Sequence, residues 1–160
     1  MTKQEIYALL EGEGVAFTAV EHEAVYTVEE AARLALPHPE AGAKNLFLRD
    51  DKKRAYLLLV MRDDREADLR AIQAKAGTRR LSFASVADLM ALLGLRRGSV
   101  TPLGALNDAE HRVRVLIDSA FHGRAIWAHP CENTASVLLA ADDLFRLLAD
   151  RGVRVEWIGI

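Results

Sequence analysis

The seven residues AYLLLVM at positions 55–61 constrain the fold more than any other part of the chain. They are apolar without the every-second-residue alternation of a half-exposed strand, which predicts a central strand buried on both faces. The apolar run at 45–49 precedes them, and the charged tetrapeptide 50–53 joins the two. This arrangement predicts a β-hairpin with its charged tip in water. Because the second strand is buried on both faces, other elements must cover each side of the sheet.

Helix and strand signals alternate along the rest of the chain. Thr2 and Thr27 each begin a capping box, and Ser85 opens a further helix. The predicted helices are 3–11, 28 to the residues before Pro37, 69–76, 86–93, and a last one that Asp142 or Asp143 caps and that ends near Gly152. The predicted strands are 17–22, 45–49, 55–61, 113–117, 125–128, 135–140 and 153–160. Together they predict one α/β (α+β) domain over residues 1–160, with helices around a mixed sheet of about seven strands.

The composition argues against several classes of protein. A net charge of −2 gives no general attraction to nucleic acid, so such binding would need a local basic patch. A single cysteine, Cys131, allows no internal disulfide and fits a reducing compartment. The N-terminus lacks the apolar core of a signal peptide, and no apolar run approaches the roughly 20 residues that cross a bilayer. We therefore expect a cytoplasmic protein.

The familiar catalytic motifs are missing from the chain. Its five histidines are scattered without the spacing of a zinc site, so we expect no metal. The chain has no Gly-x-Ser-x-Gly elbow, no Walker loop and no dinucleotide fingerprint, so we expect no nucleotide cofactor. Cys131 would need a nearby base such as His129 to act as a nucleophile. A buried, inert cysteine is the better interpretation.

Three quieter features remain, and each has two interpretations from the residues alone. Lys44-Asn45 starts an apolar strand, where the lysine is either a solvated cap or a charge directed into a cleft. The loop from Gly98 to Pro102 either connects two elements or presents backbone amides to an anion or an oxyanion. The stretch from His129 to Asn133 is either a polar turn or a clamp on a substrate.

Five segments, taken in order, resemble the YbaK/ProX family of free-standing editing domains that clear mischarged aminoacyl-tRNA. They are VEHEAVYTVEEA (20–31), AKNLFLRD (43–50), RRLSFAS (79–85), GSVTPLGALND (98–108) and AHPCENTASV (128–137). The resemblance covers nearly the whole chain. The Gly-Ser-Val-Thr-Pro loop and LSFAS are most similar to the branch that hydrolyses alanyl-tRNA(Pro), often described as a prolyl-tRNA synthetase-associated domain. The resemblance implies a barrel-like mixed sheet surrounded by helices.

The resemblance also implies roles for particular residues. The catalytic group would be Lys44, the backbone amides of Gly98 and Ser99, and His129. The substrate-binding group would be Thr27, Val28, Asn45, Thr101, Pro102 and Asn133. The acceptor-stem phosphates of tRNA would meet Lys75, Arg79 and Arg80. The implied partners are the acceptor end of tRNA(Pro) and a prolyl-tRNA synthetase, with no metal or cofactor.

The implied reaction is ester hydrolysis by water, which needs donors for the developing oxyanion more than it needs a nucleophile. The neighbouring ribose hydroxyl of the substrate would help to position the water. A pocket that fits an alanyl group would exclude the prolyl ring by size. Two alternatives stay open: a cysteinyl-tRNA(Pro) deacylase of the YbaK branch, and a non-catalytic module that binds tRNA or a synthetase.

Overall fold

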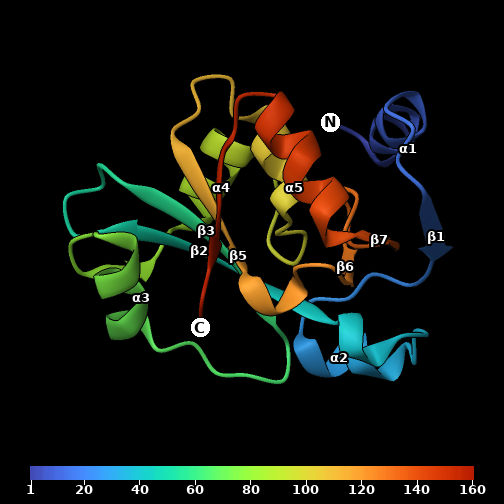
Figure 1. The fold of residues 1–160 in the computed structure, drawn as a ribbon, viewed down its shortest axis with the longest axis horizontal. Helices are drawn as coiled ribbons and strands as arrows, with labels where there is room; N and C mark the ends of the chain where they lie inside the picture. The colour runs from blue at the N-terminus through green and yellow to red at the C-terminus, as the bar shows by residue number, and fades with distance from the viewer.

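The computed structural model describes residues 1–160, which form eight strands in two sheets with five α-helices around them (Figure 1). The strands are β1 Phe17–Glu21, β2 Ala43–Asp50, β3 Tyr56–Arg62, β4 Leu81–Phe83, β5 Val113–Asp118, β6 Ala125–Ala128, β7 Ala135–Ala140 and β8 Arg154–Ile158. The helices are α1 Lys3–Gly12, α2 Val28–Arg33, α3 Leu69–Ala76, α4 Val86–Leu93 and α5 Ala141–Asp150. Three 3₁₀ turns are η1 Pro39–Ala41, η2 Pro102–Asn107 and η3 Ser119–Phe121.

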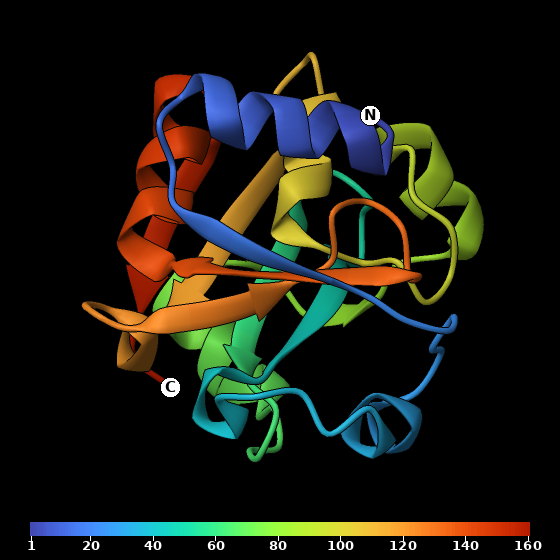
Figure 2. The same cartoon turned by 90° about the vertical axis from the view of Figure 1, so that its right-hand side faces the viewer.

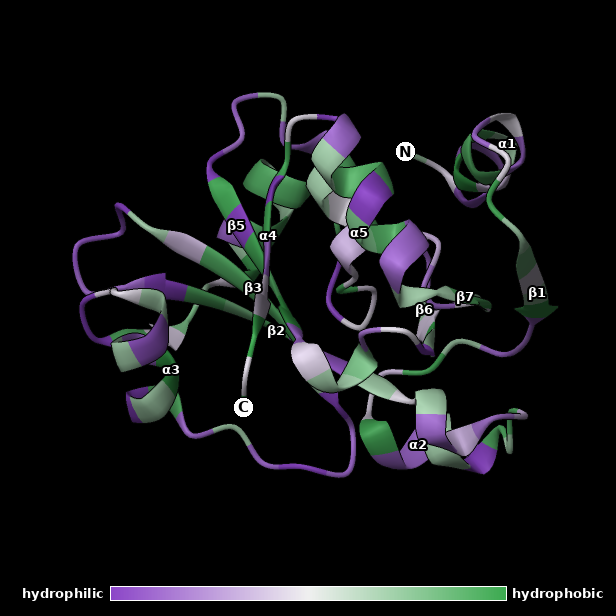
Figure 3. Ribbon diagram, viewed as in Figure 1, coloured by the Kyte–Doolittle hydropathy of each residue, from purple (hydrophilic) through white to green (hydrophobic).

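The larger sheet has the order β4-β2-β3-β5-β8. The predicted hairpin of β2 and β3 is antiparallel, whereas β3 pairs with β5 and β5 with β8 in parallel, so this sheet is mixed. Every residue of β3 except Arg62 is buried, which confirms the predicted central strand. Figure 3 shows β3 coloured hydrophobic between the helices, while the loop that joins it to β2 is hydrophilic.

The smaller sheet has the order β1-β7-β6 and is antiparallel throughout. Figure 2 shows the blue strand β1 beside the orange strands β6 and β7. The predicted α/β (α+β) class with helices around a mixed sheet is confirmed, while the strands form two open sheets rather than one barrel-like sheet of about seven strands. The strand β4 was not expected, since three residues with two exposed side chains carry no recognisable alternation. The strand β7 pairs with the distant β1 and with β6, whereas β5 pairs with β3 and β8 in the larger sheet.

The core lies on both faces of the larger sheet. A cluster of 27 buried residues fills one side, and a cluster of 8 fills the other under α3. Successive residues of β3 divide between them: Leu58 and Val60 belong to the large cluster, Leu57 and Leu59 to the small one. This division is the two-residue period of a strand with no solvent-facing side.

The helix starts follow the predicted caps with two departures. The capping box predicted at Thr27 is incomplete, because the carboxylate of Glu30 accepts from the amide of Tyr26 and not from that of Thr27. Thr2 makes both bonds of a capping box, and Thr27 and Ser85 accept hydrogen bonds from the third residue of α2 and α4. The helix α5 starts after Ala140 with no side-chain cap, so the prediction that Asp142 or Asp143 is the cap is wrong. Both aspartates lie in the first turn instead, where their negative charge is stabilised by the positive end of the helix dipole. None of the helices combines the length and the apolar character that a bilayer crossing requires.

Candidate functional site

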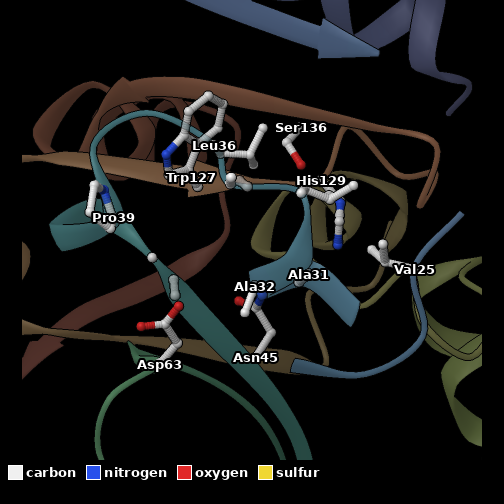
Figure 4. Close-up of a pocket in the computed structure, with 15 residues that line it drawn as sticks. Val25, Ala31, Ala32, Leu36, Pro39, Asn45, Asp63, Trp127, His129 and Ser136 are labelled. Atoms are coloured by element: carbon white, nitrogen blue, oxygen red, sulfur yellow. The ribbon is translucent and has the colours of Figure 1, made fainter. Parts of the chain in front are cut away.

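A cavity of about 310 Å³ lies where the two sheets meet, and α2 forms one of its walls (Figure 4). We call it the α2 cavity. It is lined by Val25, Ala31, Ala32, Leu34, Ala35, Leu36, Pro39, Gly42, Ala43, Asn45, Asp63, Trp127, Ala128, His129 and Ser136. The lining is mostly apolar with a few polar groups, as in small-molecule sites generally.

Two hydrogen bonds from the smaller sheet hold the cavity walls in place. The indole Nε1 of Trp127 on β6 donates to the carbonyl of Pro37 at 2.8 Å and ties down the segment after α2. The Nδ2 of Asn133 donates to the carbonyl of Val25 at 3.0 Å and ties down the segment before α2. The wall that α2 provides is therefore anchored at both ends by side chains that follow or belong to β6.

His129 and Asp63 are the two titratable side chains that line the α2 cavity. The Nδ1 of His129 donates to the carbonyl of Ala135 at 2.9 Å. Burial is the main cause that lowers the pKa of His129, and the neighbouring His22, with ring centroids 6.3 Å apart, lowers it further. The ring is therefore neutral at physiological pH, with its Nε2 lone pair free to accept a proton. Figure 4 shows this ring directed toward the space that Val25 and Asn45 border.

The imidazole of His22 lies next to that of His129. The Nδ1 of His22 donates to the carbonyl of Glu23 at 2.7 Å, which leaves its Nε2 to accept the hydroxyl hydrogen of Ser136 at 2.9 Å. The Ser136 hydroxyl oxygen, held in this way, keeps its lone pairs for the cavity that it lines.

Asn45 brings an unpartnered polar group to the α2 cavity. Its Oδ1 is buried and has no hydrogen-bond partner in the protein. A buried acceptor without a partner costs about 1–3 kcal/mol, so a bound molecule with a donor would be stabilised here. Of the two residues that the sequence singled out at the start of β2, Asn45 lines the cavity and Lys44 does not. Because strand side chains alternate, Lys44 lies on the face of β2 opposite Ala43 and Asn45.

Asp63 lines the cavity at its rim, just after β3. Burial and the adjacent Asp64 raise the pKa of the Asp63 carboxyl, while Arg62 and Lys44 act in the opposite direction. The charge of Lys44 therefore reaches the rim even though its side chain is not in the lining. A Cβ at Gly42 would overlap the Asp63 carboxylate, so glycine is required for this close approach.

A second hollow of about 420 Å³ adjoins the first, and we call it the β4 groove. It is lined by Asn45, Leu46, Phe47, Phe83, Ala84, Ser85, Val86, Leu89, Arg97, Gly98 and Val100. Asn45 belongs to both linings and marks the junction between the two hollows.

Gly98 and Val100 are the residues of the predicted loop that line a hollow, and Gly98 is held in an unusual conformation. Its φ of +86° favours glycine, and a Cβ would approach Tyr26 to 2.8 Å and Asn133 to 3.3 Å. The backbone amide of Gly98 donates to no acceptor in the protein. The amide of Ser99 already donates to the carbonyl of Arg96 at 3.0 Å, so it is not free for a bound oxyanion.

Three other residues of the predicted loop lie inside the protein, away from both hollows. Ser99, Thr101 and Pro102 are buried and line neither hollow. The Oγ1 of Thr101 accepts from the amide of Leu103 and caps η2. On α2, Thr27 is likewise a cap, and Val28 is an exposed side chain outside the lining.

The three predicted tRNA contacts lie around α3, on the opposite side of the molecule from α2 (Figure 1). Lys75 donates to the carbonyl of Gly159, and Arg79 forms an ion pair of 2.6 Å with Asp51. Arg80 is exposed and immediately precedes β4, so it stands at the far end of that strand from Asn45.

Cys131 is buried at 9% exposure within the large core cluster. Burial raises the pKa of its thiol to about 11, which keeps it protonated and unreactive. Nowhere do three or more His, Cys, Asp or Glu side chains gather in a way that could hold a metal ion.

Sequence reasoning missed several residues of the site. Trp127 and Ser136 lie on strands that were predicted, but nothing local indicated which face met a cavity. Ala31 and Ala32 fall within the helix predicted from residue 28, but nothing in the sequence indicated that they line a cavity. One signal in the sequence could have identified such residues, which is their closeness to a predicted site residue. Trp127, for example, is two residues before His129.

Comparison with known proteins gives a consistent result. Residues 22–147 match the model of the aminoacyl-tRNA editing domain. The chain is 39% identical over 151 residues to the prolyl-tRNA editing protein ProX of Acetoanaerobium sticklandii, covering 94% of this chain and 92% of that one. It is 34% identical over 155 residues to the prolyl-tRNA synthetase associated domain-containing protein 1 of Danio rerio, covering 92% and 82%. Its fold matches a solved structure described as a candidate trans-editing enzyme for prolyl tRNA synthetase, with a TM-score of 0.72, 22% identity, and coverage of 99% and 96%.

Proposed function

Because the chain belongs to the aminoacyl-tRNA editing domain family, we propose that it is the trans-acting deacylase that hydrolyses the alanyl ester of mischarged tRNA(Pro). The matched domain and the ProX relative support the reaction class, which is removal of an amino acid from tRNA. The choice of alanine rests on the resemblance of the loop 98–102 and of LSFAS to the branch that acts on this ester.

The observation that carries the proposal is the position of Asn45. Its unpartnered carboxamide lies at the junction of the α2 cavity and the β4 groove. An aminoacyl ester has two sides, a small amino acid and a nucleoside, and two adjoining hollows suit those two sides. The amino group of the amino acid and the neighbouring ribose hydroxyl are donors on the two sides of the ester, and either can supply the partner that the Asn45 Oδ1 lacks.

In this proposal His129 binds the attacking water and accepts its proton. Its neutral ring accepts a hydrogen bond through Nε2, because Nδ1 is committed to the carbonyl of Ala135. A water held by this lone pair is aligned for attack and passes its proton toward the imidazole as the tetrahedral intermediate forms. The lowered pKa of His129 keeps the base form available at neutral pH.

The developing oxyanion needs donors rather than a nucleophile. The free amide of Gly98 and the Nδ2 of Asn45 are the candidate donors, and both residues line the β4 groove. Lys44 contributes positive charge at the rim beside Asp63. Asn133 positions the mouth of the cavity through its bond to Val25.

Selection among amino acids falls to the wall that α2 provides. A cavity of about 310 Å³ has room for more than an alanyl side chain, so total volume alone does not exclude the prolyl ring. The discriminating contacts are those beside the ester, made by Ala31 and Ala32 together with Leu34. The partners in this proposal are the acceptor end of tRNA(Pro) and a prolyl-tRNA synthetase that produces the mischarged ester, both in the cytoplasm.

The test is single-turnover deacylation of alanyl-, cysteinyl- and prolyl-tRNA(Pro) by the wild type and by Lys44→Ala. We expect rapid loss of alanine alone, and loss of activity in the variant. Release of cysteine instead would keep the family reaction and refute the alanine assignment. Stable esters despite measurable tRNA binding would refute catalysis and favour a binding module.

A further inference from the structure

The loop that joins β6 to β7, residues 129–134, connects the α2 cavity to the rest of the protein. It carries His129, which lines the cavity, and Asn133, which bonds to the cavity wall. Asn133 contacts Val25 twice: its Nδ2 donates to the carbonyl of Val25 at 3.0 Å, and its own carbonyl accepts from the amide of Val25 at 3.3 Å. Because Val25 lines the cavity, the position of this loop fixes part of the cavity wall.

The loop has an unusual backbone conformation at its centre. Cys131 has a φ of +65°, in the left-handed region that residues other than glycine rarely adopt. Such a conformation persists only where the surrounding contacts hold it. The buried side chain of Cys131 packs in the large core cluster, which is one such contact. The hydrogen bonds of the residues that follow Cys131 are the others.

Glu132 links the loop to the first helix. Its Oε2 accepts from the backbone amide of Lys3 at 2.7 Å, and its side chain is half-buried. Lys3 is the first residue of α1, so its amide has no acceptor within the helix, and the positive end of the helix dipole stabilises the Glu132 carboxylate. Figure 2 shows the start of α1, at the end marked N, above the orange loop between β6 and β7.

Other contacts fix the start of α1 in turn. The Nζ of Lys3 forms an ion pair of 2.6 Å with Glu21 at the end of β1, and the hydroxyl of Tyr7 donates to the same carboxylate at 3.1 Å. The helix therefore offers the loop a fixed support. This support lies outside the range that matches the editing domain, since α1 precedes residue 22.

We propose that Glu132 is a positioning residue of the α2 cavity. Its bond to the amide of Lys3 holds the loop 129–134 in place, and Asn133 passes this restraint on to Val25. Glu132 touches no substrate and acts only through its neighbours. The consequence for catalysis rests on the proposed function, whereas the consequence for Val25 does not.

The test compares Glu132→Ala and Glu132→Gln with Glu13→Ala. The glutamine variant keeps a side-chain oxygen that accepts from the amide of Lys3, so it is expected to behave as the wild type. Glu13 is the C-cap of α1 and forms an ion pair of 2.7 Å with Arg151 at the end of α5. Glu13→Ala is the matched control, because it removes a carboxylate that holds the other end of the same helix.

Hydrogen exchange of the Val25 amide reports on the loop without any substrate, because this amide donates to Asn133. Glu132→Ala is expected to exchange about 10-fold faster at Val25, while the amides of the buried strand β3, which report global opening, change less. Glu132→Gln and Glu13→Ala are expected to keep the wild-type exchange at Val25. In single-turnover deacylation of alanyl-tRNA(Pro), Glu132→Ala should lower the maximal rate about 10-fold and Glu132→Gln should restore it.

Two results would overturn the proposal. One is wild-type exchange at Val25 in Glu132→Ala. The other is equally fast exchange at Val25 in Glu132→Ala and Glu13→Ala, because α1 would then support the whole domain and not this loop.

The inference and the proposed function can fail separately. If exchange at Val25 depends on Glu132 but the wild type hydrolyses no aminoacyl ester, the positioning contact stands and the deacylase proposal falls. If the wild type and Glu132→Ala hydrolyse alanyl-tRNA(Pro) at the same rate, the function stands and the role of Glu132 in the site is refuted.

Discussion

The two short helices α2 and α3 lie at opposite sides of the molecule and are held in different ways (Figure 1). Both begin at a capping side chain, Thr27 for α2 and Asp68 for α3. The inner face of α3 packs Ile72 into the small core cluster, whereas α2 has no buried residue and faces a cavity. A helix that packs on a core contributes to stability, and one that borders empty space is available to shape a site.

The largest effect is expected on the deacylation rate, when a residue of the α2 cavity is replaced. Replacing Asn45 by alanine should slow deacylation by about 10²- to 10³-fold, because one polar group beside the reacting carbonyl is lost. The free energy of unfolding should not fall, since the buried Oδ1 has no partner to lose. Single-turnover rates and chemical denaturation of the same preparations measure the two effects. A clear loss of stability with normal catalysis would contradict the role of Asn45.

A substitution under α3 is expected to have the opposite result, which is lower stability with an unchanged rate. Ile72→Ala removes a side chain that is 2% exposed, and should lower the free energy of unfolding by about 3 kcal/mol. The rate per folded molecule should stay the same, because Ile72 is not part of either hollow. Urea denaturation followed by circular dichroism gives the first quantity. A fall in the rate per folded molecule, measured at low temperature where the variant is folded, would contradict the contrast between α2 and α3.

The two caps provide a matched pair. Asp68 accepts from the amides of Arg70 and Ala71, so Asp68→Ala should cost about 1 kcal/mol of global stability. Thr27→Ala removes a similar bond, from the amide of Glu30, in a helix with no buried residue. We expect the loss to appear as local opening of α2 with weaker discrimination between alanyl and prolyl esters.

Hydrogen exchange of the α2 amides, measured beside the melting temperature, separates these outcomes. Should Thr27→Ala lower the melting temperature as much as Asp68→Ala does, α2 would be part of the cooperative core.

The smallest effect concerns pH. Burial lowers the pKa of His129 from the usual 6.5, so the neutral base persists as the pH falls through 6.5 and is lost only below it. The acid limb of the deacylation rate should therefore have its midpoint below pH 6.5. His22→Gln removes a neighbouring ring that lowers this pKa, and should move the midpoint upward. A midpoint at or above 6.5 in the wild type would exclude His129 as the base.

The same contrast explains how much the sequence could predict. The strand β3, its hairpin with β2 and three of the four named caps follow from local patterns, because burial on both faces and capping are encoded within a few residues. The pairing of β1 with β7 joins residues more than a hundred positions apart, and no period in the chain indicates it. The predicted α/β class is confirmed, but the division of the strands into two sheets could not be predicted from local patterns.

The candidate site shows the same limit. Asn45 and His129 could be named from the sequence, since each is a polar residue beside an apolar run. Their common cavity could not, because it is lined from both sheets and from the segments on either side of α2. The different faces of Lys44 and Asn45 could have been anticipated, since neighbours on a strand point to opposite sides.

The pairing of β1 with β7 has a consequence for how the protein comes into being. During synthesis Glu21 is made long before its partner Ala135, so the smaller sheet cannot close until most of the chain exists. The larger sheet's hairpin, by contrast, joins neighbours and can form early. The large core cluster includes Val137 and Leu139 of β7, and the α2 cavity is bordered by both sheets. The core and the site therefore both wait for the C-terminal part of the chain, and only the hairpin of β2 and β3 can form ahead of them.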